Sequence, residues 1–307
     1  MNAAGAHLDA AVASLLTLSK AERIEAILCD RFVHHERANA LIEECNYLAL
    51  RPRSLRPRGL LICGLSNAGK TAFSEALSRS LESLPPTDRT PATQPYVLIS
   101  VVGARDAREI MLRFLEALGC PAPDRYTTAQ RRRRAFQLAK LAQVRALIVD
   151  ELQDLVNITP RQRVLTLLAL KDIMNSLRLP IIALGTPDAQ VALQADPHLN
   201  ARFAFRDLPV WECDGYLEHF LEAYESSLPL ARRSHLNSLP MMRLITKSTA
   251  GSLGDMVLRL QTAAALAVET GDERITEALF RRSEFGFPRL SGHPIAATMR
   301  GGAYGRG

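Results

Sequence analysis

Short apolar runs alternate with amphipathic stretches in the middle of the chain, which predicts a parallel β-sheet covered by helices. The apolar runs typical of strands are residues 60–63, 96–102, 146–149, 180–184 and 204–208. Apolar residues recur at helical spacing between these runs, in residues 71–84, 108–118, 129–143 and 161–177. We therefore predict an α/β core with a five-stranded parallel sheet over residues 59–211.

The segments on either side of this core show helical patterns without strands. Residues 1–58 read as a helical N-terminal segment, in which Ser19 and Glu22 form a capping box, followed by a basic, proline-broken linker. After Trp211 the helical stretches are 216–227, 239–248, 252–269 and 276–283. We expect an all-helical lid domain over 212–284 and a flexible, glycine-rich tail over 285–307.

Composition places the chain among globular proteins and excludes several classes. Of 307 residues, 47% are hydrophobic and 23% are charged, a balance that excludes a mainly disordered chain. Apolar runs stay below the roughly 18 residues of a membrane span, and the first ten residues do not resemble a signal peptide. The five cysteines are scattered without a C-x-x-C pair. We therefore expect a cytoplasmic, bacterial protein with no membrane partner.

The chain has a net charge of +6, and most of its positive charges are arginines. Only five of the 38 basic residues are lysine, which leaves 33 arginines. Because the planar guanidinium group matches phosphate geometry, the excess is compatible with a polyanionic partner. An arginine-rich proteome explains it equally well.

The turn after the first strand matches a phosphate-binding loop, G-x-x-x-x-G-K-[ST], at every fixed position. Glycines let successive backbone N–H groups point at one anion, and the following helix N-terminus adds positive potential. Lys70 is placed to reach the β- and γ-phosphates of ATP, and the Thr71 hydroxyl to bind Mg²⁺. The predicted nucleotide-binding residues are Gly64, Leu65, Ser66, Asn67, Ala68, Gly69, Lys70, Thr71 and Ala72.

Two carboxylates follow the third predicted strand, at Asp150 and Glu151. Asp150 is expected to hold the water shell of the Mg²⁺ ion. Glu151 is expected to orient and polarise the attacking water as a general base. Strand ends often carry Asp, but together with the phosphate loop this pair predicts ATP hydrolysis.

Two further residues are candidates for sensing the γ-phosphate. Thr186 follows the strand 180–184, where a polar side chain can contact the terminal phosphate; it also fits an N-cap, with Pro187 at the first helical position. Arg202 precedes the last strand and is the candidate arginine finger for a neighbouring subunit, with Arg206 as the alternative.

The chain resembles the AAA+ ATPases, and within them the transposition regulators of the TniB and TnsC type, which are related to the IstB helper ATPases. The similarity runs from about residue 15 to 285. Its more specific part is 178–212, because the Walker motifs occur in many ATPases. The segments that carry it are 21–24, 30–32, 66–71, 147–152, 178–186, 196–203, 208–212, 227–230 and 251–255.

The resemblance implies a P-loop NTPase with a helical lid that assembles as a ring or filament on double-stranded DNA. It implies two protein partners, a DDE-type transposase and a target selector of the TniQ type. Lys70 and Thr71 would bind ATP and Mg²⁺, Asp150 and Glu151 would run hydrolysis, and Arg202 would complete a neighbour's site. One departure is the segment 251–255, which lacks the arginine that many AAA+ lids carry; Arg259, one turn on, is not assigned.

The resemblance also implies DNA contacts near the second strand and the helices that follow it. Arg113 falls in this region as well. The densest basic run is 131–134, and such a run is more often a solvated helix face than a binding surface. Binding there would use phosphates and depend weakly on sequence. The candidate residues are Arg105, Arg108, Arg131, Arg132, Arg133 and Arg134.

We therefore predict an oligomeric ATPase that couples target selection to transposition, with slow hydrolysis in keeping with the departure in the lid. Three alternatives remain from the sequence: a nucleotide-gated scaffold, a replication-type helper ATPase that loads another enzyme onto DNA, and a small-molecule P-loop kinase. Thr186, Arg202 and the helical lid argue against the kinase.

Overall fold

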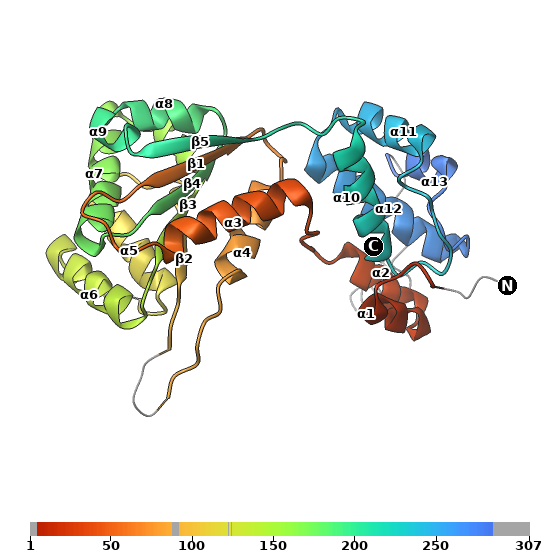
Figure 1. The fold of residues 1–307 in the computed structure, drawn as a ribbon, viewed down its shortest axis with the longest axis horizontal. Coiled ribbons are helices and arrows are strands. Elements are labelled where there is room, and N and C mark those ends of the chain that lie inside the picture. Colours follow the sequence, from red (N-terminus) through yellow and green to blue (C-terminus); the bar gives the residue numbers. More distant parts are fainter. Residues whose placement is uncertain (1–4, 88–91, 122, 124, 285–307) are drawn as a thin grey trace, which may run out of the picture. The chain divides into compact units, whose positions relative to one another are not determined.

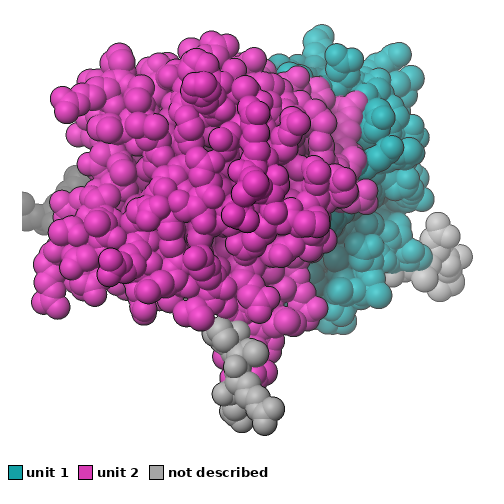
Figure 2. All heavy atoms as spheres, turned by 60° about the vertical axis from the view of Figure 1, so that its left-hand side comes forward, with its two compact units in different colours: residues 1–36, 210–307 teal, residues 37–209 magenta. Residues whose placement is uncertain are grey.

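The computed structural model describes residues 5–87, 92–121, 123 and 125–284, and the chain separates into two compact units. The core unit is residues 37–209, and the helical unit combines residues 1–36 with residues from 210 onward (Figure 2). The predicted N-terminal segment, 1–58, is thus divided between the two units. The predicted tail, 285–307, lies outside the described residues.

A five-stranded sheet in the order β2-β3-β4-β1-β5 forms the centre of the core unit (Figure 1). All the pairs are parallel, which confirms the predicted sheet. β4 lies between β1 and β3, the strands that carry the phosphate loop and the acidic pair. The strands are β1 (Gly59–Gly64), β2 (Tyr96–Ser100), β3 (Ala146–Asp150), β4 (Ile181–Gly185) and β5 (Phe203–Leu208).

Helices cover both faces of this sheet, so its inner strands are buried throughout. Leu61 belongs to a large apolar cluster with residues of α5, α6, α7 and α8, whereas its neighbour Leu60 is buried on the other face. On that other face, α4 packs against β2, β3 and β4. Asn46 of α3 accepts hydrogen bonds there from Ser80 (2.8 Å) and from the Tyr96 hydroxyl (2.7 Å).

The helices of the core unit agree broadly with the predicted ones. The predicted helix 71–84 is too long, because α4 ends at Arg79. The short elements η2 and α9 were not predicted, and a helix at the place of α8 was considered only as the reason for a cap at Thr186. The helical elements are α3 (Glu36–Leu50), α4 (Lys70–Arg79), α5 (Ala107–Ala117), α6 (Thr128–Leu141), the 3-10 helix η2 (Leu152–Asn157), α7 (Pro160–Leu177), α8 (Asp188–Gln194) and α9 (Pro197–Asn200).

The helical unit is built from both ends of the chain around a second apolar core. Ile24 and Ile27 of α2 join residues of α10, α11, α12 and α13 in that core. The ring of Trp211 lies 5.0 Å from that of His35 and 4.8 Å from that of Phe220. The elements are α1 (Ala10–Ala13), the 3-10 helix η1 (Ser14–Thr17), α2 (Lys20–Leu28), α10 (Gly215–Ser226), α11 (Leu239–Thr249), α12 (Leu253–Thr270) and α13 (Glu277–Arg282).

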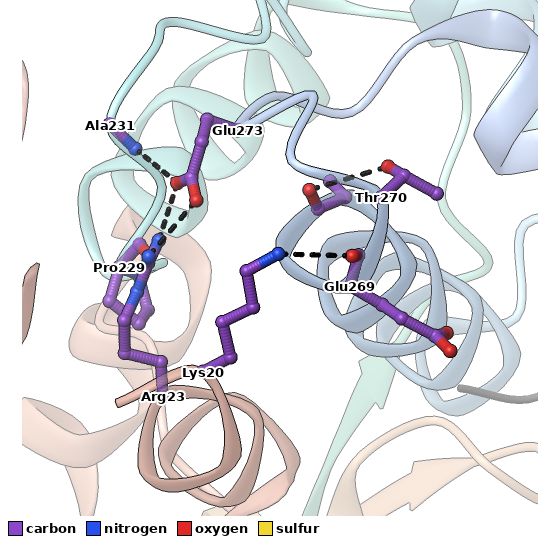
Figure 3. Close-up of polar contacts among 8 residues, drawn as sticks. Lys20, Arg23, Pro229, Ala231, Glu269, Thr270 and Glu273 are labelled. Carbon is purple, nitrogen blue, oxygen red and sulfur yellow. Dashed lines mark hydrogen bonds and ion pairs between the residues drawn. The ribbon is translucent and has the colours of Figure 1, made fainter. Parts of the chain in front are cut away.

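Polar contacts attach the N-terminal helix α2 to the rest of this unit (Figure 3). The predicted capping box of Ser19 and Glu22 starts the helix. Arg23 then donates to Glu273 (3.0 Å from Nη1 to Oε1) and to the Pro229 carbonyl (2.7 Å). Lys20 donates to the carbonyl of Glu269 at 3.2 Å.

Across the described ranges, none of the helices combines the length and the hydropathy that crossing a membrane requires.

Candidate nucleotide site

The phosphate loop joins β1 to α4 in a conformation that leaves room beside its backbone. Asn67 and Gly69 have φ angles of 60° and 84°, in the left-handed region. A Cβ atom at Gly64 would lie 3.0 Å from the Cβ of Ala68 and 3.1 Å from that of Leu208. A side chain would therefore crowd the turn where a phosphate approaches the backbone, and the residues present fit a nucleotide.

Lys70 is the first residue of α4, and its side chain folds back over the loop. Its Nζ donates to the carbonyl oxygens of Gly64 (2.9 Å) and Leu65 (2.7 Å), and the residue is only 7% exposed. Burial lowers the pKa of Lys70, and the negative charges of Glu151 and Asp150 oppose that shift. The ammonium group is thus placed beside the loop and faces both carboxylates.

Asp150 ends β3 and is connected to the first turn of α4. The hydroxyl of Ser74 donates to the Thr71 carbonyl (2.9 Å) and lies 3.5 Å from an Asp150 carboxylate oxygen. Asp150 is 7% exposed, and burial raises its pKa although the Glu151 N–H donates to it at 2.9 Å. The Thr71 hydroxyl and the Asp150 carboxylate supply the oxygen ligands that Mg²⁺ prefers, so this position suits the ion.

Glu151 is held by a residue that the sequence analysis missed. The backbone of Glu151 has a φ of 59°, and its carboxylate accepts a hydrogen bond from the side-chain amide of Gln153. The carbonyl oxygen of the same amide accepts from the Thr186 N–H at 3.1 Å. Gln153 therefore links the predicted general base to the end of β4. A pattern search for acids and bases passes over a neutral amide, and only the spacing Asp-Glu-x-Gln could have indicated it.

Thr186 follows β4 directly, between the strands that carry the acidic pair and the phosphate loop. The N-cap interpretation is wrong, because the N-cap of α8 is Pro187 and no side chain caps the helix. A Cβ atom at Gly185 would lie 2.7 Å from the Gln153 side-chain oxygen. A glycine before Thr186 thus makes room for the amide that orients Glu151.

Both predicted arginine fingers are held by other residues of their own chain. Arg202 precedes β5, at the amino-terminal ends of the parallel strands, whereas the phosphate loop follows the carboxyl-terminal end of β1. Arg202 donates to Asn175 at 2.6 Å. The alternative, Arg206, forms an ion pair with Glu44 at 2.6 Å. Arg259 in the helical unit donates to the carbonyl of Phe280 at 3.0 Å and lies 4.7 Å above its ring, so the lid arginine that we left unassigned packs within its own unit.

The arginines predicted to contact DNA fall into different environments. Arg131 is 1% exposed and donates to the Tyr126 carbonyl at 3.2 Å, and Arg132 pairs with Asp172 at 2.8 Å. Because a buried guanidinium cannot reach a DNA phosphate, Arg131 is removed from the candidates. Arg113 donates to backbone carbonyls at the end of β2. Arg132 is exposed, but it is held by its ion pair with Asp172. The remaining candidates are all exposed: Arg105, Arg108, Arg133 and Arg134.

Solved structures of other proteins share this fold. The Orc1 protein of Aeropyrum pernix, in a complex with DNA, matches with a TM-score of 0.62 and 17% identity, over 85% of this chain and 68% of that chain. The Orc2 protein of the same organism, with ADPNP and ADP, matches with 0.62 and 15% identity, over 89% and 74%. Cdc6p of Pyrobaculum aerophilum matches with 0.60 and 17% identity, over 88% and 74%. The chain therefore has the AAA+ ATPase fold.

The family follows from the sequence. Residues 23–213 match the family described as Bacterial TniB protein, which is more than half of the chain. This protein belongs to the TniB family, as the resemblance of its motifs predicted. No curated protein sequence matches it.

Proposed function

We propose that this TniB protein is a Mg²⁺-dependent ATPase that assembles as a homo-oligomer on duplex DNA and regulates transposition. The observation that carries the proposal is the meeting of Lys70, Asp150 and Glu151 beside the phosphate loop of an AAA+ fold. Asp150 and Lys70 are both buried there, which is unusual for charged groups without a ligand to bind.

The residues of the site divide the work of hydrolysis. The backbone N–H groups of residues 64–72 hold the phosphates, and Lys70 exchanges its loop carbonyls for the β- and γ-phosphate oxygens. When bound by Thr71 and Asp150, Mg²⁺ would neutralise phosphate charge. Glu151 orients a water molecule and takes its proton while the water oxygen attacks the γ-phosphorus and ADP departs with the bonding electrons. Thr186 contacts the γ-phosphate, and Arg202 reaches the site of a neighbouring copy.

DNA binding in this proposal uses the exposed arginines Arg105, Arg108, Arg133 and Arg134. One subunit presents few such contacts, so an oligomer is needed to align them along the phosphates and gain affinity by counterion release. We propose that the DNA-bound oligomer receives a TniQ-type target selector and directs a DDE-type transposase. The DNA-bound state of the similar Orc1 structure supports this only by analogy of fold.

Fluorescence anisotropy with a labelled random-sequence duplex tests the proposal. We expect binding with ATP, but not with ADP or without nucleotide, and a steep loss of affinity as the salt concentration rises. Lys70→Ala should abolish this binding, and Glu151→Gln should prolong it. If ATP is hydrolysed but the duplex never binds, the transposition function is wrong while the ATPase function stands.

A second candidate is a nucleotide-gated scaffold, in which ATP binding assembles the oligomer and hydrolysis is incidental. It is favoured by the helical unit, where Arg259 is held by Ser248, Phe280 and Glu284. An arginine held in this way is not free to sense the γ-phosphate. Oligomer lifetimes that are the same in the wild type and in Glu151→Gln would favour this candidate.

A further inference from the structure

A pocket of about 640 Å³ lies at the amino-terminal ends of the parallel strands, opposite the ends that carry the phosphate loop. Its walls come from the segments that precede β1, β3, β4 and β5, which are parallel and therefore start at the same edge. The lining is strongly cationic. Its arginines are Arg51, Arg53, Arg56, Arg58, Arg145, Arg178 and Arg202.

Some of these arginines build the walls. Arg53 donates to the carbonyl oxygens of Leu177 (2.7 Å) and Val144 (3.1 Å), and Arg145 donates to that of Ala49 (3.2 Å). Burial lowers the pKa of Arg53, and the positive charge of Arg145 lowers it further.

The other arginines of the pocket keep donors that no described residue accepts. The side chains of Arg56, Arg58 and Arg178 are exposed and make no hydrogen bond or ion pair with any described residue. The Nε of Arg202 is buried and lacks an acceptor within the described part of the chain.

The positive charge of the pocket is not balanced by a neighbouring acid. Among the described residues that line it, the one acid is Glu44, and Arg206 already holds both of its carboxylate oxygens, at 2.9 and 2.6 Å. Several guanidinium groups therefore face one cavity without a carboxylate of the described lining between them. Like charges gathered around one concave surface raise the local positive potential and favour an anion there.

The shape and charge of the pocket indicate the class of anion. Guanidinium groups bind phosphate oxygens through paired hydrogen bonds, and several of them require a ligand with several adjacent charges. The volume lies within the range of small-molecule sites, and a concave site suits a compact group better than a straight duplex backbone. We propose that this pocket receives the phosphate chain of a nucleoside triphosphate, bound by Arg58 and Arg178 together with Arg202.

The phosphate chain can come from two sources. One is a free nucleotide. The other is the nucleotide in the phosphate loop of a second copy, and this source rests on the proposed function. The two ends of the strands carry unlike surfaces, a phosphate loop at one and an arginine pocket at the other, and a head-to-tail contact between copies would bring the two together. In that case Arg58 and Arg178 assist the proposed finger Arg202.

The first experiment tests the free source with a probe that lacks a base. Inorganic tripolyphosphate is titrated into the Lys70→Ala protein and its binding is measured by calorimetry. The substitution weakens binding at the phosphate loop, so that binding at the pocket can be measured. In this protein, Arg58→Gln with Arg178→Asn should weaken binding about tenfold or more. Asn is chosen because residue 178 has a φ of 53°, a conformation that Asn tolerates. The control is Arg161→Gln with Arg243→Gln, two exposed arginines outside the pocket.

The second experiment tests the source held by a second copy. The Lys70→Ala protein keeps the arginine pocket but lacks a working phosphate loop. The Arg58→Gln/Arg178→Asn protein keeps the phosphate loop but lacks two arginines of the pocket. If the arginines act on a neighbour, mixing the two proteins should restore ATP hydrolysis to several times the sum of the separate rates.

The outcomes separate the pocket from the proposed function. Binding of tripolyphosphate that depends on the arginines supports the free source, and recovery on mixing supports the second copy. If neither occurs while the wild type hydrolyses ATP in a Lys70-dependent manner, the pocket proposal is overturned and the ATPase stands. If the wild type does not hydrolyse ATP, the proposed function fails, and the titration alone decides the pocket.

Discussion

The helical unit and the nucleotide site of the core unit differ in how their buried charges are partnered. In the helical unit, Arg23 and Glu273 pair with side chains only 8% and 19% exposed, and buried Glu225 accepts hydrogen bonds from three consecutive backbone N–H groups. In the nucleotide site, the buried Lys70 forms no ion pair with any described carboxylate, and the same holds for the more exposed arginines of the pocket at the opposite ends of the strands. Elsewhere in the core unit a partly buried charge can be paired, as Lys171 is with Asp196. Paired charges hold a fold together, whereas charges that lack a counter-ion create a demand for a ligand.

The comparison predicts that removing Lys70 destroys activity without destabilising the fold. Lys70→Ala should lower kcat/KM for ATP by about 10²- to 10³-fold, because a preorganised cation no longer meets the phosphates. Its free energy of unfolding should change little or increase, because a buried ammonium group bonded only to carbonyls is costly. Steady-state hydrolysis and urea unfolding measure the two effects. A large fall in stability would show that Lys70 has a structural role.

Glu151 is expected to act on the chemical step alone. Glu151→Gln keeps the shape of the side chain but removes the base, so kcat should fall about 10²-fold while ATP still binds. The measurement is single-turnover hydrolysis together with nucleotide binding by calorimetry. An unchanged kcat would exclude Glu151 as the general base.

In the helical unit, the same kind of substitution should act on stability. Arg23→Met leaves Glu273 without its cation and the Pro229 carbonyl without a donor, so the free energy of unfolding should fall by about 2–3 kcal/mol. The matched control is Arg233→Met, because Arg233 pairs with Glu222 where both side chains are about half exposed. That change should cost less than about 0.5 kcal/mol. Equal losses in the two variants would contradict the comparison.

Gln153 extends the comparison to an uncharged residue, because its side-chain amide positions the charged Glu151. Gln153→Leu removes the amide between Glu151 and Thr186, and kcat should fall about tenfold with KM nearly unchanged. Gly185→Ala should have a similar effect, because its methyl group would displace the same amide. A rise in KM without a fall in kcat would mean that Gln153 serves substrate binding instead.

The pH dependence of the Arg23 pair gives the smallest effect. Burial alone would raise the pKa of Glu273, but hydrogen bonds from Arg23 and from the Ala231 N–H hold the pKa below its ordinary value. The resulting stability is complete above the unfolded-state pKa, and it is lost as the pH falls through the lower folded-state value. The stability difference between wild type and Glu273→Gln should therefore shrink in acid. A difference that grows as the pH falls would contradict this assignment.

Local patterns were enough for the framework of the core unit. Buried parallel strands appear as continuous apolar runs, so all five strands were predicted within one or two residues at most ends. The phosphate loop and the Asp150–Glu151 pair are each contiguous in sequence, so the residue pattern alone was enough to predict the chemistry that we propose for them. The errors arose where local signals compete. The apolar spacing of residues 71–84 continues past Arg79, but the helix does not.

By itself, the sequence determined the AAA+ fold, the family and the residues proposed to bind and hydrolyse ATP, because those signals lie within short segments. Only the tertiary structure decided that α2 packs with α12, that Gln153 joins Glu151 to Thr186, and that Arg131 is buried. It also decided that arginines from four separate segments line one pocket. Such contacts join residues far apart along the chain, and they depend on how the strands are ordered in the sheet, which no local pattern of hydrophobic and polar positions records.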